Sequence, residues 1–151
     1  MIYFNCDYLE GGHPKILEKM LSTNMEQLTG YSTDHYCDSA RERIRQACGC
    51  PDADVHFLVG GTQTNLTAIA SILRPYQGVL AAHDGHIACH ETGAIEATGH
   101  KVLPIPCVDG KITADQVREF CHSHQTNTMR EHMVQPGMVY ISFPTEIGSL
   151  P

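Results

Sequence analysis

Two glycines followed by hydroxyl and amide side chains could bind a phosphate. Gly60 and Gly61 follow the apolar run 55–59 and lead into Thr62 and Gln63. Glycines let the backbone turn sharply, and the unpaired N–H groups and dipole at a helix start attract an anion. The lysine of a Walker loop and the Gly-x-Gly-x-x-Gly spacing of a dinucleotide site are both missing, so nucleoside triphosphates and NAD fit poorly. An ordinary strand-to-helix turn with a threonine cap is an equally good interpretation of these residues.

Histidines and a glutamate form a second group with chemical potential: His83, His86, His90 and Glu91. His86 and His90 are four residues apart, so one helix face could present both to a zinc ion. The His-Glu-x-x-His order of a metalloprotease is missing and no third ligand has a recognisable spacing, so we predict no metal site. A histidine after a strand, beside a phosphate site, also suits a flat aromatic cofactor over which its ring can lie.

Cysteine usage and charge narrow the class of protein. The seven cysteines are an odd number and residues 1–5 do not look like a signal peptide, so we expect reduced thiols in the cytoplasm. Cys48 and Cys50 form one Cys-x-Cys, for which a structural role is favoured over a metal or redox role. The net charge of -7, without a run of lysine or arginine, argues against nucleic acid or an anionic membrane as partner. No apolar run approaches the roughly 18 residues of a membrane span, so we expect a soluble protein.

Helices and strands must position these groups, and the sequence predicts that they alternate. Apolar periodicity and caps predict helices at 14–23, 34–48, 63–73, 86–98 and 113–121. Compact apolar runs predict strands at 55–59, 79–82, 102–105 and 138–142. Residues 1–13 are expected to form an irregular arm and residues 123–136 a polar connection. The alternation predicts an α/β fold of three layers, a mainly parallel sheet with helices on both faces.

The carboxyl ends of parallel strands meet at one rim of the sheet, which is where ligands bind. Gly60-Gly61-Thr62, His83–His86 and Phe143–Glu146 each follow a predicted strand, so we expect all three at that rim. Pro104 suggests either the end of its strand or an edge strand. The chain stops a few residues after the last strand without a covering helix, so we expect the domain to be incomplete.

Four motifs in a fixed order resemble a known family: Asp7-Tyr8-Leu9-Glu10-Gly11-Gly12-His13-Pro14, Gly60-Gly61-Thr62-Gln63-Thr64-Asn65, Asp84-Gly85-His86 and His90-Glu91-Thr92-Gly93-Ala94. With Thr145-Glu146-Ile147-Gly148, the chain resembles the N-terminal part of the threonine aldolase and β-eliminating lyase family. The resemblance implies a pyridoxal-phosphate (PLP) enzyme of the aspartate-aminotransferase fold type. It also implies an N-terminal arm with the first helix over 1–30, and the first part of the PLP-binding large domain over 31–151.

The resemblance further implies roles for individual residues at the cofactor. Gly61, Thr62 and Gln63 fall where the family binds the cofactor phosphate. His86 looks like the family's histidine that stacks on the pyridine ring, and we assign it to cofactor binding and catalysis. Glu146 takes the place of a histidine that many threonine aldolases use for the proton of the substrate's β-hydroxyl, so we expect a catalytic role for it and a best substrate other than L-threonine.

Two further residues are implied at the substrate, again by resemblance. Tyr31 lies where family members bring a tyrosine to the active site, often across a dimer interface, although Ser32 replaces the usual following glycine. Cys6 lies where many members have a serine near the substrate carboxylate. The implied partners are therefore an amino-acid substrate and further copies of the protein, as a homodimer or homotetramer.

The family also needs a lysine that holds the cofactor covalently and an aspartate at the pyridinium nitrogen. Both are expected beyond this chain, because Lys15, Lys19, Lys101 and Lys111 do not match the family's motif and are expected to be solvated surface residues. We therefore expect the complete protein to be a PLP-dependent lyase acting at Cα–Cβ or on a β-substituent, and this chain alone to be inactive. Two alternatives stay open: a PLP-dependent aminotransferase, and a non-catalytic piece that only dimerises or binds phosphate.

Overall fold

The computed structural model describes residues 9–148, so the prediction for Cys6 lies outside the described residues. The chain divides between Phe57 and Leu58 into two compact units, called unit 1 and unit 2. The division after residue 30 that the resemblance implies stays a prediction. Among the described residues, no helix combines the length and apolar character needed to cross a bilayer.

Unit 1 contains two helices that begin and end where the sequence predicts. Helix α1 (Pro14–Thr23) has its proline in the first turn, where a missing N–H costs nothing. Helix α2 (His35–Cys48) begins at Asp34, whose carboxylate accepts hydrogen bonds from the backbone N–H groups of Tyr36 and Cys37. It ends at Gly49, which adopts the left-handed conformation at φ 64°. Neither helix contains a buried residue.

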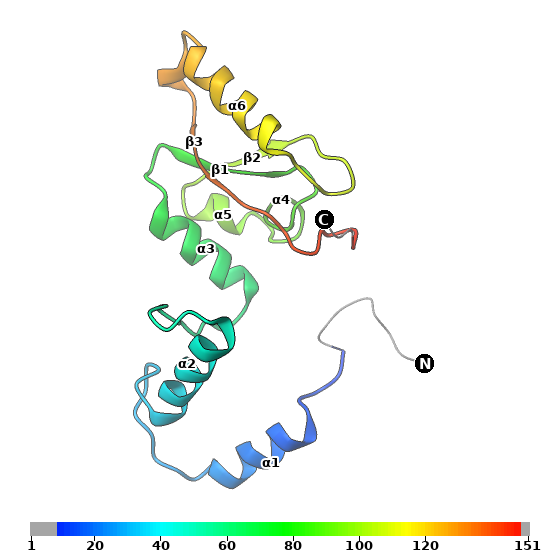
Figure 1. Ribbon diagram of the computed structural model, residues 1–151. Helices are drawn as coiled ribbons and strands as arrows, with labels where there is room; N and C mark the ends of the chain where they lie inside the picture. The colour runs from blue at the N-terminus through cyan, green and yellow to red at the C-terminus, as the bar shows by residue number, and fades with distance from the viewer. Residues whose placement is uncertain (1–8, 149–151) are drawn as a thin grey trace. The chain divides into compact units, whose positions relative to one another are not determined.

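Unit 2 is built on a parallel three-stranded sheet in the order β2-β1-β3 (Figure 1). Its strands are β1 (Gln77–Ala82), β2 (Val102–Ile105) and β3 (Gln135–Val139). The central strand β1 is buried over nearly its whole length, as expected for a strand covered on both faces. Pro104 lies on the edge strand β2, which confirms the expectation drawn from that residue.

Helices cover both faces of the sheet, as Figure 1 shows. One face packs against α3 (Gly61–Ile72), α4 (His86–Cys89) and α5 (Ala94–Ala97), and the other against α6 (Ala114–Thr126). The first core contains Ile69, Leu73, Val79, Ala81, Ile87, Ile95 and Val102. The second contains Leu80, Leu103 and Ile105, with Val117 and Phe120 of α6 against them. The predicted α/β class, a parallel sheet between layers of helices, is therefore confirmed.

Two of the predicted strands were wrong: one is not a strand, and the other begins earlier in the chain than predicted. Residues 55–59 form no strand among the described residues, although the run is apolar. Backbone pairing makes a strand, and no described strand pairs with this run. The last strand begins at Gln135 rather than Met138, because Gln135 and Pro136 align with Gln77 and Gly78 of β1. Part of the predicted polar connection 123–136 is thus strand, and the rest holds the end of α6 and the short 3-10 helix Arg130–His132.

The predicted helix over 86–98 is two short helices, which corrects that expectation. The break lies at Thr92 and Gly93, which both have positive φ, 51° and 76°. A continuous helix cannot contain these conformations. Glu91 immediately precedes the break, and its side chain is fully buried. The break therefore accompanies a polar contact made inside the unit, which helical periodicity does not encode.

Candidate active site

The loops that follow β1 and β3 converge at one rim of the sheet. His86 opens α4, four residues after the end of β1, and its backbone N–H donates to Ser142 Oγ at 3.2 Å. Gly85 suits the position before it, because a Cβ there would make a tight contact of 3.0 Å with the carbonyl oxygen of Ala82. The rim predicted from the sequence thus brings the His83–His86 and Phe143–Glu146 segments together.

His86 lies between two carboxylates. Its Nδ1 is 3.1 Å from Glu146 Oε1, and its Nε2 is 3.7 Å from Glu91 Oε1. His90 Nε2 is 3.8 Å from the other oxygen of Glu146. An ionised carboxylate only accepts hydrogen bonds, so Nδ1 of His86 donates to Glu146. Glu146 therefore fixes the orientation of the His86 ring, while about two-fifths of that side chain remains exposed, at 39%.

Glu91 is the buried member of this group, and it links the site to α3. Asn65 Nδ2 donates to Glu91 Oε1 at 2.7 Å and lies 3.4 Å from the Tyr140 hydroxyl. Glu91 Oε2 is buried and has no hydrogen-bond partner among the described residues. Burial raises the pKa of the Tyr140 hydroxyl, and the negative charges of Glu91 and Glu146 raise it further, so this hydroxyl keeps its proton at neutral pH. The site can therefore offer neutral donors beside an incompletely satisfied carboxylate.

Asn65 and Tyr140 were not predicted from the sequence as site residues, and Glu91 was named only in a family motif and in the histidine group weighed for metal binding. Asn65 stands on α3 and Tyr140 directly after β3, 75 residues apart. The available signal was positional, because Tyr140 comes at the end of a strand pointing to the predicted rim. Nothing in the local sequence indicates that Asn65 reaches across to it.

The N-terminus of α3 has the features of an anion site. No side chain caps it, in contrast to α2, and Gly60 takes an extended conformation before the first turn. Space is open around the Cα atoms of Gly60 and Gly61. The first backbone N–H groups of a helix lack intrahelical partners and point outward, so Gly61 and Thr62 can donate to an anion. The side-chain oxygen of Gln63 accepts the N–H of Val59 at 2.8 Å and closes the turn, while the assignment of Gln63 to the cofactor phosphate stays a prediction.

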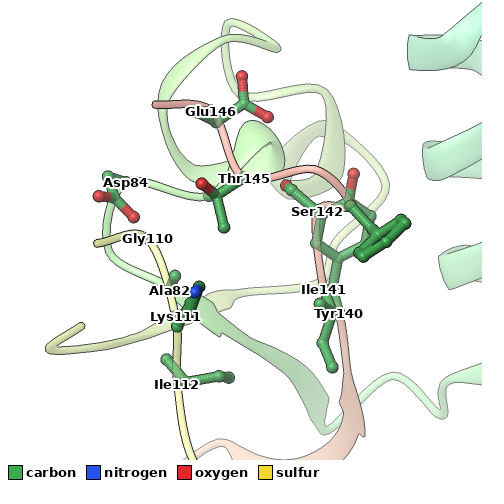
Figure 2. Close-up of a pocket in the computed structure, with 12 residues that line it drawn as sticks. Ala82, Asp84, Gly110, Lys111, Ile112, Tyr140, Ile141, Ser142, Thr145 and Glu146 are labelled. Carbon is green, nitrogen blue, oxygen red and sulfur yellow. The ribbon is translucent and has the colours of Figure 1, made fainter. Parts of the chain in front are cut away.

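A cavity of about 190 Å³ lies beside Glu146 (Figure 2). Asp84, Thr145 and Glu146 lie at one end of it and Ile112 at the other. Its volume is below the roughly 300–1,000 Å³ of most ligand sites, so it suits part of a ligand rather than the whole. Lys111 is exposed, as predicted from the sequence. It also lines this cavity, which was not predicted.

Tyr31 is the remaining predicted site residue among those described. It belongs to unit 1, its side chain is fully exposed, and its φ of 60° is rare for a residue other than glycine. Ser32 has nearly the same φ, 59°, at the position where the family usually has a glycine. The backbone at this point therefore adopts a glycine-like conformation without glycine.

Comparison with known proteins identifies the family of the chain. The family model for β-eliminating lyases matches residues 4–148 of the chain. The chain belongs to the β-eliminating lyase family. Membership confirms the resemblance found in the motifs, which the match spans from the N-terminal arm to the loop after Glu146.

Similar proteins place the chain near threonine aldolases within the β-eliminating lyase family. Low specificity L-threonine aldolases of Pseudomonas sp. (strain NCIMB 10558) and Pseudomonas aeruginosa are 28% and 27% identical over 149 residues, covering 97% of this chain and 42% of each relative. A solved threonine aldolase of Leishmania major is 49% identical, with a TM-score of 0.88, covering 95% of this chain and 41% of that one. The chain therefore spans less than half the length of the relatives it matches.

Proposed function

We propose that the complete protein is a PLP-dependent lyase that acts on amino acids, cleaving the Cα–Cβ bond or eliminating a β-substituent. The observation that carries the proposal is His86, held by Glu146 at the strand-end rim, with helix α3 joined to the same group of residues by the hydrogen bond from Asn65 to Glu91. A flat, anionic, phosphorylated cofactor matches a partly exposed imidazole ring together with an uncapped helix start. When bound, PLP supplies an electron sink that stabilises negative charge at the substrate's Cα.

The residues described here would hold the cofactor and handle protons. Gly61 and Thr62 would bind the phosphate through backbone N–H groups and the threonine hydroxyl. His86 would lie against the cofactor ring, oriented by Glu146. Glu146 would also accept the proton from the β-substituent, because its carboxylate lines the cavity at the strand-end rim and can reach a group bound there.

The covalent attachment of the cofactor is expected on a lysine outside the 151 residues. Of the four lysines here, Lys111 is the competitor, because it lines the cavity beside Glu146. Borohydride reduction of the complete protein with PLP, followed by peptide mapping, tests the assignment. We expect the pyridoxyl group on a lysine outside this chain, and a stoichiometric label on Lys111 would overturn it.

Reaction type is tested with a panel of amino acids. A lyase releases an aldehyde or a β-leaving group without a second substrate, whereas an aminotransferase needs a 2-oxo acid to complete each turnover. We expect product without 2-oxo acid, and faster turnover of another β-substituted amino acid than of L-threonine. A strict requirement for a 2-oxo acid would favour the aminotransferase, and no turnover with any substrate would favour a non-catalytic protein.

We further propose that the complete protein is a cytoplasmic homodimer or homotetramer, with Tyr31 serving an active site at the interface. The full exposure of Tyr31 within the single chain supports this. Light scattering measures the assembly, and a fully active monomer would contradict the proposal.

A further inference from the structure

A second cluster of ligating side chains lies at the rim, apart from the His86 and Glu146 pair. It is formed by His83, Asp84 and Cys107, whose ligating atoms all lie within 4.8 Å of one another. Cys107 Sγ is 3.3 Å from His83 Nδ1 and 2.9 Å from Asp84 Oδ1. The metal ligands considered from the sequence were a different set around His86 and His90. Cys107 was missed because it lies more than 20 residues after Asp84 in the chain.

The sheet itself places these three residues together. His83 and Asp84 follow β1 directly, and Cys107 follows β2 after one intervening residue. Parallel pairing sets Ala82 beside Ile105, and the N–H of His83 continues the ladder by donating to the Ile105 carbonyl at 2.9 Å. Sites held by regular elements keep their geometry better than sites on free loops. The cluster is therefore held in place by the backbone rather than by chance contacts of long side chains.

The distances match a tetrahedral metal site. Zinc lies about 2.3 Å from a cysteine sulfur and about 2.0 Å from a histidine nitrogen or carboxylate oxygen, so ligand atoms on neighbouring corners are about 3.5 Å apart. The two contacts of Cys107, at 3.3 and 2.9 Å, are somewhat shorter than that spacing, and all three ligating atoms lie within 4.8 Å of one another. Small side-chain rotations would bring the three atoms onto one ion.

Charge also favours a cation. The Cys107 thiol donates a hydrogen bond to the Asp84 carboxylate at 2.9 Å. A dication would take the place of the thiol proton, which would be released to solvent. The resulting thiolate and the Asp84 carboxylate would balance the two positive charges, and neutral His83 would complete the donor set.

We propose that His83, Asp84 and Cys107 form a binding site for a divalent cation of the zinc class. A thiolate, an imidazole and a carboxylate together select a borderline-soft ion over magnesium or calcium, which prefer all-oxygen sites. Three protein ligands leave a fourth position for water or a ligand group, as in catalytic zinc sites. Asp84 also lines the cavity of Figure 2, so the site adjoins the candidate active site.

Cobalt substitution of the complete, PLP-free protein tests the site, since Co²⁺ bound by thiolate gives a near-ultraviolet charge-transfer band. The measurement uses a background with Cys48→Ser and Cys50→Ser, which removes the exposed Cys-x-Cys as a competing ligand pair. We expect a single equivalent of Co²⁺ with the thiolate band, displaced by Zn²⁺. No band at stoichiometric cobalt, or a band unchanged by Cys107→Ser, would overturn the proposal.

His83→Ala supplies a variant that should fold normally, because His83 is exposed. We expect it to lower cobalt affinity by roughly 10²-fold or more. Residues that only support a metal ligand already contribute about 10- to 100-fold to affinity, and His83 would be a ligand itself. His122→Ala, an exposed histidine on α6, should leave the affinity unchanged. Equal affinities for the two histidine variants would contradict the site, and circular dichroism checks that Cys107→Ser remains folded. Because PLP is absent, the outcome does not depend on the proposed lyase activity.

Discussion

Unit 1 and unit 2 both contain amphipathic helices, but among residues 9–148 only those of unit 2 bury apolar side chains in a continuous core. In α1 the apolar stripe of Ile16, Leu17, Met20 and Leu21 is exposed, with Leu21 at 81%. In unit 2, Ile95 on the four-residue helix α5 is fully buried. An apolar stripe stabilises a fold only when an opposing surface covers it, and the sheet of unit 2 supplies that surface.

The two units also differ in how their helices begin. Helix α2 starts with an aspartate that accepts two backbone N–H groups, whereas α3 starts with glycines and has no side-chain cap. A capping carboxylate and a bound phosphate satisfy the same N–H groups. In unit 1 the Asp34 carboxylate therefore occupies the start of α2. In unit 2 the N–H groups at the start of α3 can bind the anion of a ligand.

The largest expected effect tests the contrast in burial. In the 151-residue chain, Ile95→Ala should lower the free energy of unfolding by about 2–5 kcal/mol, because it leaves a cavity in the first core. Leu21→Ala is the matched control and should change it by less than about 0.5 kcal/mol, because the side chain is exposed. Urea unfolding measures both.

Repeating the Leu21→Ala measurement on the complete protein sharpens the same comparison. A loss that appears only there would mean that a surface outside the single chain covers the α1 stripe. Similar losses for Leu21→Ala and Ile95→Ala in the 151-residue chain would contradict the contrast between the units.

The next effect tests the charge at the rim of unit 2. Glu146→Gln in the complete enzyme should lower turnover by roughly 10² or more while cofactor affinity is unchanged, because an amide cannot accept the substrate's proton. Steady-state kinetics and PLP titration measure the two quantities. Glu96→Gln, an exposed glutamate on α5, is the control and should leave turnover unchanged.

Glu146→Ala separates proton transfer from the orientation of His86. Glutamine can still accept the hydrogen bond from His86 Nδ1 through its amide oxygen, whereas alanine cannot. Wild-type turnover in Glu146→Gln combined with a large loss in Glu146→Ala would make Glu146 a positioning residue only.

A smaller effect tests the uncapped start of α3. Thr62→Ala should weaken PLP binding by about 1.5–3 kcal/mol, roughly ten- to a hundred-fold, through loss of one hydrogen bond to a charged phosphate. Thr67→Ala, exposed in the middle of the same helix, should have no effect on affinity. Equal PLP dissociation constants for both variants and the wild type would remove the phosphate site from α3.

The smallest effect concerns the capped start of α2. Hydrogen bonds from Cys37, first from its side chain and then from its backbone N–H, lower the pKa of the Asp34 carboxyl. A carboxyl with a lowered folded-state pKa adds stability above its unfolded pKa, near 3.8, and loses it as pH falls through the folded value. Asp34→Asn should therefore make the acid limb of thermal stability shallower. A melting-temperature profile from neutral to acidic pH measures this, and parallel profiles for variant and wild type would contradict it.

Local chemistry made much of this structure predictable. Helix α2 begins after Asp34 and ends at Gly49, where expected, and Thr113 forms a capping box with Gln116 at the start of α6. Each of these contacts joins residues within one helical turn, so residue type and spacing are sufficient to predict them. The meeting of the His86 and Glu146 segments, 60 residues apart, was also predicted, because both follow strands whose carboxyl ends lie at the same rim of a parallel sheet.

What the sequence by itself determined were the caps, the two strands at 79–82 and 102–105, and the order of motifs that marks the family. Tertiary structure decided the remainder: whether the run 55–59 has a pairing partner, where β3 aligns with β1, and how Glu91 comes to be buried against Asn65. It also decided that Cys107 meets His83 and Asp84. Local propensity acts between neighbours in sequence, whereas these contacts depend on register and packing between segments that only the folded sheet brings together.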